Sequence, residues 1–389
     1  MSENLQAYDE RKKIAYVSSY PPRECGIATF TKNLIVASNK LNIFRKPRVI
    51  AINEKEAIYN YDRRVRCQIR RDFQKDYVKA ASYINSSKVD LVNLQHEFGL
   101  FGGEWGEYIN TFLEKLQKPV VSTLHTISPS FEPKAKTVLK QIAEHSSKII
   151  TMTNTAKKII MDYDVPQNKI EIIQHGCPDV PFVDSNKIKS SLFGLKRKTV
   201  LSTFGLLSRS KGIQHVIKAL PEVVDKYPEI VYIVIGETHP EVRKFEGERY
   251  RKKLIKLVED LDLFENVKFH NRFLHERELI KYLQATDIYI TPSLEPNQIS
   301  SGTLVYAMGT GKAIIATPYL HAQEALGNGR GILCKFKDHR SITKGIIQLL
   351  EDEELRMIMQ RKAYSYSRDF TWNEVAKRYA NLFRRMINS

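Results

Sequence analysis

The sequence has few cysteines and lacks any long apolar run. Its cysteines number four and stand far apart in the chain, at Cys25, Cys67, Cys177 and Cys334. None belongs to a C-x-x-C pair, so a zinc site is not expected, and free thiols point to a reducing compartment. No apolar run approaches the roughly 20 residues that a membrane-spanning helix needs. Residues 1–13 also lack the apolar core of a signal peptide, so we expect a cytoplasmic protein, with the inner face of the membrane as a further, peripheral location.

Acidic residues are also in short supply. Asp and Glu together number 44 against 61 Lys and Arg, which gives a net charge of +17. The excess cations gather in residues 45–48, 63–71 and 196–198, and no nucleic-acid-binding module accompanies them. This pattern favours phosphate-bearing small substrates or anionic lipid headgroups as partners, with a merely basic solvated surface as the alternative.

The length and composition indicate two globular domains. With 389 residues, of which 42% are hydrophobic and 27% charged, the chain exceeds one ordinary core. Residues 14–17 have the pattern of a buried strand, residues 20–26 form a break, and residues 27–41 have helical spacing. Gly26 at the helix start would let a substrate approach the backbone closely. Further strands are expected at residues 49–53, 89–94, 120–124, 149–153 and 170–174.

Histidine follows three of the expected strands. His96, His125 and His175 each stand where an apolar run ends. Glu97 comes directly after the first of them. Parallel sheets bind ligands outside the carboxyl ends of their strands, where these rings would gather and serve hydrogen bonding or proton transfer. The alternative for each is a packed structural histidine, and their spacing matches no metal-binding motif.

The second half of the chain repeats the alternation of strand, loop and helix. Residues 177–191 are irregular and contain prolines, so we expect the linker between the domains there. Strands are expected at residues 199–204, 230–235, 267–269 and 288–290. The predicted fold is α/β, with two Rossmann-like domains that face a central cleft. The predicted domains are residues 1–185, residues 186–365 and a C-terminal helix, residues 366–389, that packs back across the domain junction.

The segment from Ile288 to Lys335 contains a candidate anion site. A strand at residues 288–290 leads into a polar loop, and a short helix follows at residues 304–308. Small residues stand at the start of that helix, namely Ser300, Ser301, Gly302 and Thr303. Backbone N–H groups at the positive end of a helix dipole suit a phosphate or diphosphate. The alternative is an ordinary capped helix.

These patterns together resemble one enzyme family. The stretches that carry the resemblance are TLHT around His125, IIQHG at His175, FGLLSRSKG at residues 204–212, TDIYITPS from Asp287 and AMGTGKAIIAT at residues 307–317. Along nearly its whole length the chain is similar to the retaining glycosyltransferases of family 4, also called group 1, which have the GT-B fold. The resemblance implies an N-terminal domain on the acceptor side and a C-terminal domain that binds a nucleotide-sugar donor.

The resemblance also implies roles for individual residues. Lys211, with Arg209, would neutralise the diphosphate of the donor, and His125 would lie beside the transferred sugar. Further contacts to the donor are expected from Gly26, Gly205, Gly236, Thr238, Ser300, Ser301, Gly302, Thr303 and Tyr306. Contacts to the substrate are also expected from His96, Glu97, His175 and Glu295, of which His96 is inferred from its place after a strand and not from the resemblance. Neither a metal nor a cofactor is expected, since cations and a helix dipole can stabilise the leaving phosphate.

The chain departs from the family at its usual pair of glutamates, the first near the sugar and the second on the ribose hydroxyls. Gln298 and Tyr306 stand at those positions, and Glu295 precedes the first in the same loop. A glutamine can hydrogen-bond a sugar hydroxyl but has no negative charge, and a tyrosine lacks the two oxygens of a carboxylate. The predicted catalytic residues are therefore His125, Lys211, Arg209 and Gln298.

The leading functional prediction is a retaining hexosyltransferase that moves a hexosyl group from a nucleotide sugar of the GDP-mannose, UDP-hexose or ADP-hexose type to a sugar or lipid-linked acceptor. One alternative is a glycoside phosphorylase or a sugar-1-phosphate-using enzyme on the same fold. Another is a carbohydrate-binding relative without catalysis. Peripheral contact with an anionic membrane is a further predicted interaction, and nucleic acid is not an expected partner. The donor base, the hexose, the acceptor, the linkage and the oligomeric state stay open.

Overall fold

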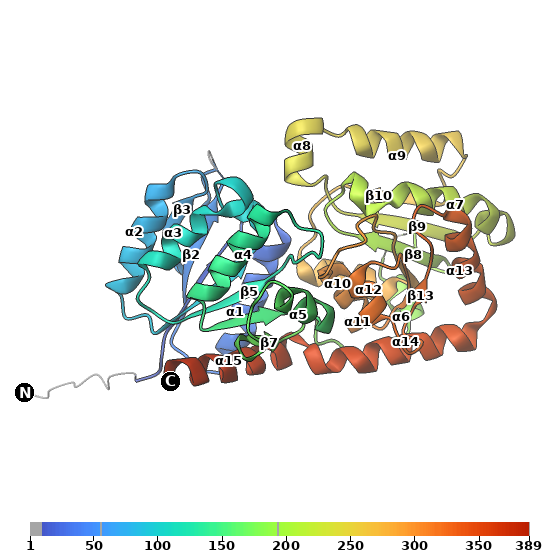
Figure 1. Ribbon diagram of the computed structural model, residues 1–389. Coiled ribbons are helices and arrows are strands. Elements are labelled where there is room, and N and C mark those ends of the chain that lie inside the picture. The colour runs from blue at the N-terminus through green and yellow to red at the C-terminus, as the bar shows by residue number, and fades with distance from the viewer. Residues whose placement is uncertain (1–9, 55–56, 193, 389) are drawn as a thin grey trace, which may run out of the picture. The chain divides into compact units, whose positions relative to one another are not determined.

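The computed structural model of the protein describes residues 10–54, 57–192 and 194–388 (Figure 1). The chain divides into two compact units. Unit 1 comprises Met1–Gln174 together with Trp372–Ser389, and unit 2 comprises His175–Thr371. Each unit contains one parallel sheet with helices packed against it, so each is an α/β unit of the Rossmann-like kind.

Unit 1 is organised around a seven-stranded parallel sheet in the order β3-β2-β1-β4-β5-β6-β7. The order reverses between β1 and β4, which is the point where open α/β sheets bind their ligands. Its strands read as near-continuous apolar runs because helices cover both faces of a parallel sheet. The strands are β1 (Ile14–Ser18), β2 (Arg48–Asn53), β3 (Val65–Arg70), β4 (Leu91–His96), β5 (Val120–Leu124), β6 (Lys148–Thr151) and β7 (Ile170–Ile172).

Strand β3 was not predicted, because its sequence was interpreted only as a cluster of cations. Along this strand only Ile69 is fully buried, and it lies on the same face as Val65 and Cys67. The arginines Arg66 and Arg70 alternate with them and are exposed. An edge strand with charged residues facing solvent is a common protection against pairing between sheets.

The helices of unit 1 include one from the far end of the chain. They are α1 (Gly26–Lys40), α2 (Gln74–Asn85), α3 (Tyr108–Lys115), α4 (Pro133–His145), α5 (Asn154–Met161) and α15 (Trp372–Asn388). Helix α15 packs against α1, where the Trp372 and Phe30 rings meet edge to face with centroids 5.1 Å apart. The buried Tyr379 hydroxyl lies 3.0 Å from Thr123 Oγ1 on β5. The end of the chain therefore completes the core of unit 1.

Unit 2 is organised around a six-stranded parallel sheet in the order β10-β9-β8-β11-β12-β13. The order reverses between β8 and β11. The strands are β8 (Thr199–Phe204), β9 (Ile230–Ile235), β10 (Val267–His270), β11 (Ile288–Thr291), β12 (Ala313–Ala316) and β13 (Ile332–Leu333). The helices are α6 (Ser185–Lys189), α7 (Ile213–Lys226), α8 (Pro240–Glu246), α9 (Arg249–Asp260), α10 (Glu276–Ala285), α11 (Gly302–Gly309), α12 (Leu320–Ala325), α13 (His339–Glu351) and α14 (Glu353–Ser367).

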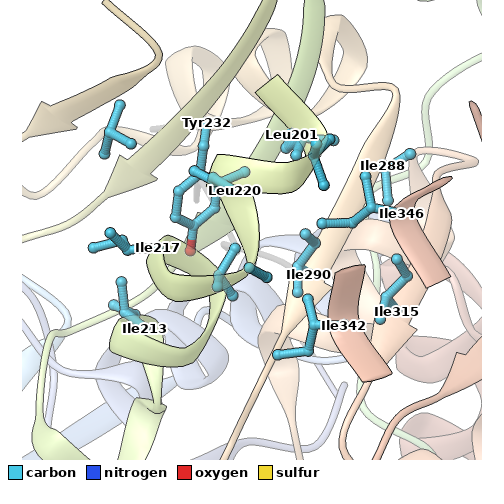
Figure 2. Close-up of a cluster of buried hydrophobic side chains, with 14 of the residues drawn as sticks. Leu201, Ile213, Ile217, Leu220, Tyr232, Ile288, Ile290, Ile315, Ile342 and Ile346 are labelled. Carbon is cyan, nitrogen blue, oxygen red and sulfur yellow. The ribbon is translucent and has the colours of Figure 1, made fainter. Parts of the chain in front are cut away.

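The core of unit 2 lies on both faces of its sheet. Figure 2 shows the larger cluster, in which side chains of α7 and α13 point toward those of the strands. Its members include Leu201, Ile213, Ile217, Leu220, Tyr232, Ile288, Ile290, Ile315, Ile342 and Ile346. Each such aliphatic side chain contributes about 1.5–3 kcal/mol when fully buried. A second, smaller cluster around Val200 and Ile233 covers the opposite face.

A buried ion pair fixes the junction of α6 with the sheet. Asp287 Oδ2 lies 2.6 Å from Lys189 Nζ and also accepts the Val200 N–H at 2.7 Å. The neighbouring Lys312 is fully buried and donates to the carbonyls of Gln284 and Thr286 at 3.0 and 3.1 Å. It thereby satisfies carbonyls at the end of α10 that have no partner within the helix.

Most of the predicted C-terminal helix, residues 366–389, is helix α15, and its first residues belong to the end of α14. Helix α14 ends at Ser367, and α15 begins at Trp372. Thr371 between them adopts an extended backbone, with φ −57° and ψ 156°, which a continuous helix cannot contain. The break coincides with the boundary between unit 2 and unit 1.

Candidate functional site

In unit 2, the loops that follow β8, β9 and β11 come together at the reversal of strand order. Gly205 and Gly236 both have positive φ, 135° and 138°. A Cβ on Gly236 would lie 2.1 Å from the Gly205 carbonyl oxygen, so only glycine fits there. A Cβ on Gly205 would lie 3.4 Å from the Thr303 methyl group at the start of α11. The structure thus brings together three of the predicted donor contacts.

The start of α11 presents backbone N–H groups at this edge. Ser301 is the N-cap, and its hydroxyl accepts the Leu304 N–H at 3.3 Å. The first N–H groups of a helix have no partner within it, so those of Gly302 and Thr303 are available to a ligand. The Ser301 hydroxyl also lies 3.2 Å from Thr303 Oγ1. The predicted helix therefore begins at Gly302. Its capping is consistent both with an anion site and with an ordinary capped helix.

Two histidines flank the start of α11. The Ser301 N–H donates to Nδ1 of the buried His321 at 2.8 Å. His175 Nδ1 donates to the Gly176 carbonyl at 2.8 Å, and a Cβ on Gly302 would lie 2.7 Å from His175 Nε2. Burial lowers the pKa of His175 and of His321 to about 4, and the proximity of His175 lowers the pKa of His321 further. Both rings are therefore neutral at neutral pH.

His321 was not predicted, although its position follows the pattern of the others. It lies in the first turn of α12, just after β12, in the stretch TPYLHAQ. A histidine shortly after a strand is the same signal that singled out His96, His125 and His175. The contact between His321 and Ser301 was not predicted because the two residues are far apart in the sequence.

Lys211 and Arg209 lie in the short helical turn that precedes α7. A Cβ on Gly212 would lie 2.1 Å from the Pro292 carbonyl oxygen, so this turn packs directly on the loop after β11. Lys211 is half-buried, and burial lowers the pKa of its ammonium while the Glu295 carboxylate opposes that shift. Arg209 is exposed and pairs with Glu246, Nη2 to Oε2 2.9 Å. The two predicted cations thus have different surroundings.

Gln298 organises the loop between β11 and α11. Its Oε1 accepts the Ser293 hydroxyl at 2.8 Å, and its Nε2 donates to the Ser300 carbonyl at 3.2 Å. Its carbonyl accepts the His321 N–H at 3.0 Å. Glu295, in the same loop, is exposed. The amide of Gln298 is therefore engaged in holding the backbone that leads to the helix start.

A carboxylate reaches Tyr306 from another helix. The Tyr306 hydroxyl donates to Glu276 Oε1 at 2.7 Å. Tyr306 is buried one turn into α11, and the half-buried Glu276 is the first residue of α10. The Phe204 ring at the end of β8 lies 6.3 Å from the Tyr306 ring. Sequence reasoning missed Glu276, because no local pattern indicates that α10 begins beside α11.

The loop after β9, which carries the predicted Thr238, is held by a buried arginine. Arg251 of α9 donates from Nη2 to the Gly236 carbonyl at 3.1 Å and from Nε to Glu248 Oε2 at 3.0 Å. The Thr238 hydroxyl donates to the same Glu248 oxygen. This bond and the two arginines nearby lower the pKa of the Glu248 carboxyl. Thr238 therefore belongs to a network that fixes the loop.

Unit 1 carries the remaining predicted residues at the carboxyl edge of its own sheet. His125 donates its backbone N–H to the His96 carbonyl at 3.0 Å, and its Nε2 donates to Gln95 Oε1 at 2.8 Å. The Phe30 ring meets it edge to face at 4.8 Å. Gly26 is the first residue of α1, and a Cβ there would meet nothing within 4 Å. Gly26 is thus open to the surface rather than required by packing.

His96 and Glu97 have less ordinary surroundings. His96 is fully buried, and in the described part of the chain neither of its ring nitrogens has a hydrogen-bond partner. Burial lowers its pKa to about 3, so it is neutral. Glu97 is half-buried and accepts the Thr126 hydroxyl at 2.5 Å, while burial raises the pKa of its carboxyl. His175, which we expected beside these rings, belongs to unit 2.

Residues 10–54, 57–192 and 194–388 contain no cluster of three or more His, Cys, Asp or Glu side chains that could hold a metal ion. Within those same ranges, no helix is both long and apolar enough to cross a bilayer.

Comparison with solved structures defines the fold class. Sucrose-phosphate synthase of Thermosynechococcus elongatus superposes with a TM-score of 0.79 at 15% identity, over 97% of this chain and 100% of that one. HepE of Anabaena, solved in complex with UDP, superposes with a TM-score of 0.74 at 17% identity, over 96% of this chain and 100% of that one. With the two parallel sheets, these likenesses confirm the predicted α/β fold of the GT-B type.

Comparison of sequences defines the family. Residues 184–366 match the family described as glycosyl transferases group 1, and residues 46–179 match glycosyltransferase family 4. Because these two matches cover most of both units, the chain belongs to the group 1, family 4 glycosyltransferases, as its motifs predicted.

Two relatives illustrate the match. An uncharacterized glycosyltransferase of Methanocaldococcus jannaschii is 31% identical over 262 residues, which are 65% of this chain and 62% of that protein. A D-inositol 3-phosphate glycosyltransferase of Corynebacterium urealyticum is 25% identical over 265 residues, 65% of this chain and 60% of that protein. The matched part thus spans less than two thirds of each relative.

Proposed function

We propose that the protein transfers a hexosyl group, with retention of configuration, from a nucleoside diphosphate hexose to a carbohydrate or lipid-linked acceptor. The observation that carries this proposal is the combination, within unit 2, of a half-buried cation, a helix start and a carboxylate–phenol pair. Lys211 and the first N–H groups of α11 suit a diphosphate. The Glu276–Tyr306 pair offers acceptor oxygens for hydroxyl groups, as a ribose requires. HepE, a structural neighbour, was solved with UDP, which supports a uridine nucleotide as the first donor to test.

In the proposed reaction, the bond between the sugar C1 and the diphosphate oxygen breaks as the acceptor oxygen bonds to C1 on the same face. The proton of the acceptor hydroxyl passes to an oxygen of the departing phosphate. Lys211 and the N–H groups of Gly302 and Thr303 stabilise the negative charge that grows on that phosphate. The neutral His175 and His321 add no positive charge, so in this proposal the stabilising charge comes from Lys211 and the helix start.

The other predicted residues have supporting roles in this proposal. His125, whose ring Gln95 holds, hydrogen-bonds the hydroxyls of a sugar. Gln298 sets the loop that leads to the helix start and presents a polar face to the sugar. Arg209 can reach a phosphate only after releasing Glu246. The Glu295 carboxylate favours the charged ammonium of Lys211, because it opposes the lowering of its pKa by burial.

The test is a thermal-shift panel of UDP, GDP and ADP and their hexose conjugates, with inorganic phosphate and hexose 1-phosphates alongside. A ligand at about 100 times its Kd adds roughly 2.7 kcal/mol of stability, which moves the unfolding midpoint visibly. A response to one nucleoside diphosphate supports the proposal and identifies the base. A response confined to phosphate and sugar phosphates would favour phosphorolysis instead. A response to neither, with glycan binding but no turnover, would indicate a carbohydrate-binding relative.

We further propose a peripheral, salt-sensitive contact with anionic membranes through the exposed side of β3 and the adjoining α2. Arg66 and Arg70 are exposed there, and Arg70 lies over the Phe73 ring at 4.1 Å. Phe73 itself is 41% exposed. Basic residues near an anionic surface each contribute about 1 kcal/mol at low salt. Co-sedimentation with phosphatidylserine vesicles should disappear between low and high salt, and salt-resistant binding would contradict this.

A further inference from the structure

Three aromatic side chains meet at the carboxyl edge of the unit 1 sheet. Phe98 and Trp105 come from the loop between β4 and α3, and Phe131 comes from the loop between β5 and α4. Phe98 lies edge to face with Trp105 at 5.4 Å and with Phe131 at 5.0 Å. The rings of Trp105 and Phe131 are 5.8 Å apart. Phe98 is buried, whereas Trp105 and Phe131 are half-buried and present part of their surface to solvent. We call Phe98, Trp105 and Phe131 the aromatic cluster.

The backbone holds Trp105 in an unusual conformation. Its φ of 53° and ψ of 30° lie in the left-handed region, which bulky residues rarely adopt. Gly103 and Gly106 on either side also have positive φ. A Cβ on Gly106 would lie 2.7 Å from the Phe98 carbonyl oxygen. This backbone conformation sets the position of the Trp105 indole.

Polar groups lie directly against the aromatic cluster. The His96 ring meets Phe98 edge to face at 4.9 Å and stacks on Phe101 at 5.6 Å. It is fully buried with both ring nitrogens unpartnered, in the part of the chain that the structure describes. The carboxylate of Glu97, the residue before Phe98, is half-buried and accepts the Thr126 hydroxyl and the Phe98 N–H. A buried imidazole without a partner is unfavourable unless a ligand supplies one.

We propose that the aromatic cluster, with Glu97 and His96, binds one pyranose ring of a carbohydrate acceptor. The apolar C–H face of the ring lies on Trp105 and Phe131, and hydroxyls at the ring edge donate to Glu97 and to a nitrogen of His96. A bare hydrocarbon chain could not supply a hydrogen bond to the buried His96 nitrogens, which have no partner among the described residues, so a sugar fits better than a lipid tail. This inference rests on the proposed transferase function, since it names the class of the second substrate.

The test uses the tryptophans of the chain. The sequence contains two, Trp105 and Trp372, so the Trp372→Phe variant reports fluorescence from the aromatic cluster alone. This variant is titrated with methyl glycosides of glucose, mannose, galactose and N-acetylglucosamine. Sorbitol, an open-chain polyol, is the control ligand. We expect a saturable change of emission with at least one pyranoside and none with sorbitol.

Variants of the aromatic cluster sharpen the result. In the Trp372→Phe background, Phe131→Ala and Glu97→Gln should each weaken the pyranoside response about tenfold, which corresponds to about 1.4 kcal/mol. The matched control is Phe264→Ala, because Phe264 is a 53% exposed phenylalanine that belongs to unit 2. It should leave the response unchanged.

The outcomes separate this inference from the proposed function. An identical, unsaturable change of emission with sorbitol and the pyranosides would overturn the inference. The absence of any change of emission with the whole panel would also overturn it. A response to decanol micelles but not to pyranosides would replace the sugar with a lipid chain. Nucleoside diphosphate binding, measured on the parent protein by thermal shift, tests the proposed function independently of any of these results.

Discussion

The carboxyl edges of the two sheets differ in their chemistry. The edge of unit 2 has a half-buried lysine, a capped helix start and a carboxylate–phenol pair, and its polar groups hold one another through Ser301, His321 and Gln298. The edge of unit 1 has the aromatic cluster, a neutral buried His96 and the Glu97 carboxyl. Under the two proposals, one Rossmann-like sheet would bind an anion at its edge and the other would bind a neutral ligand. The residues that follow the strands, and not the sheets, make this difference.

The sharpest way to break this comparison is to remove the cation of unit 2. Lys211→Ala should lower kcat for hexosyl transfer by about 100- to 1,000-fold, since preorganised charges at a leaving group supply about 2.7–4 kcal/mol. Lys211→Arg should recover part of that loss. The measurement is release of nucleoside diphosphate in the presence of acceptor.

The matched control is Lys218→Ala, which removes an exposed lysine from α7 in the same unit. It should turn over like the parent. Equal turnover of Lys211→Ala and Lys218→Ala would remove the main support for the assigned donor site.

A smaller effect is expected from the carboxylate–phenol pair. Glu276→Gln should weaken binding of UDP about 10- to 100-fold, because a hydrogen bond to a charged group contributes about 1.5–3 kcal/mol. Tyr306→Phe should have a smaller effect, since the carboxylate stays. Inorganic pyrophosphate has no ribose, so its affinity should change little in either variant. Calorimetric titration with both ligands decides the matter, and equal losses for UDP and pyrophosphate would place the pair away from the nucleoside.

The neutral histidines make the stability of both units depend on pH. His96, His175 and His321 have folded pKa values of about 3, 4 and 4, below the ordinary 6.5. Between pH 6.5 and about 4 the unfolded chain therefore binds more protons than the folded one. The free energy of unfolding should fall as the pH falls through this window, by about 1.4 kcal/mol per pH unit for each histidine.

His321→Gln keeps an acceptor for the Ser301 N–H but cannot titrate. It should therefore reduce the slope of the free energy of unfolding against pH by the contribution of one histidine. Urea unfolding at a series of pH values measures it. The exposed His145 on α4 provides the control, and His145→Gln should leave the slope as in the parent. A slope that is the same in His321→Gln and the parent would contradict the burial of this ring.

The smallest effect is expected at the second predicted cation. Arg209 is exposed and paired with Glu246, and exposed ion pairs contribute about 0–1 kcal/mol. Arg209→Ala should therefore change stability by less than about 1 kcal/mol and reduce transfer far less than Lys211→Ala. If the two variants lose activity equally, Arg209 leaves Glu246 when the donor binds, and the two cations act together.

Much of this architecture could be predicted, because parallel strands buried on both faces are near-continuous apolar runs. Strands β1, β4, β5, β8, β9 and β11 are of this kind. The helix start at Gly302 follows the last of them. Strand β3 escaped prediction since only Ile69 in it is fully buried. An apolar pattern in the sequence indicates burial. An edge strand that faces solvent has few apolar residues, so its sequence does not indicate a strand.

The site was predictable only where its residues follow strands. Lys211 and Ser301 stand in loops that the strand pattern defines. Glu276 meets Tyr306 through the packing of α10 beside α11, and the aromatic cluster forms through two loops that are separate in the sequence. Such contacts depend on how helices and loops settle on the sheet, and a linear pattern contains no information on that.

The break between α14 and α15 has a consequence for folding during synthesis on the ribosome. Trp372, Tyr379 and Phe383 of α15 are buried in unit 1, whose other residues are made before those of unit 2. At about 5–20 residues per second, the synthesis of His175–Thr371 takes roughly 10–40 s. During that time the core of unit 1 lacks the side chains of α15. The sequence of unit 2, by contrast, is complete before α15 is synthesised. The first half of the chain to be translated is thus the second to be finished.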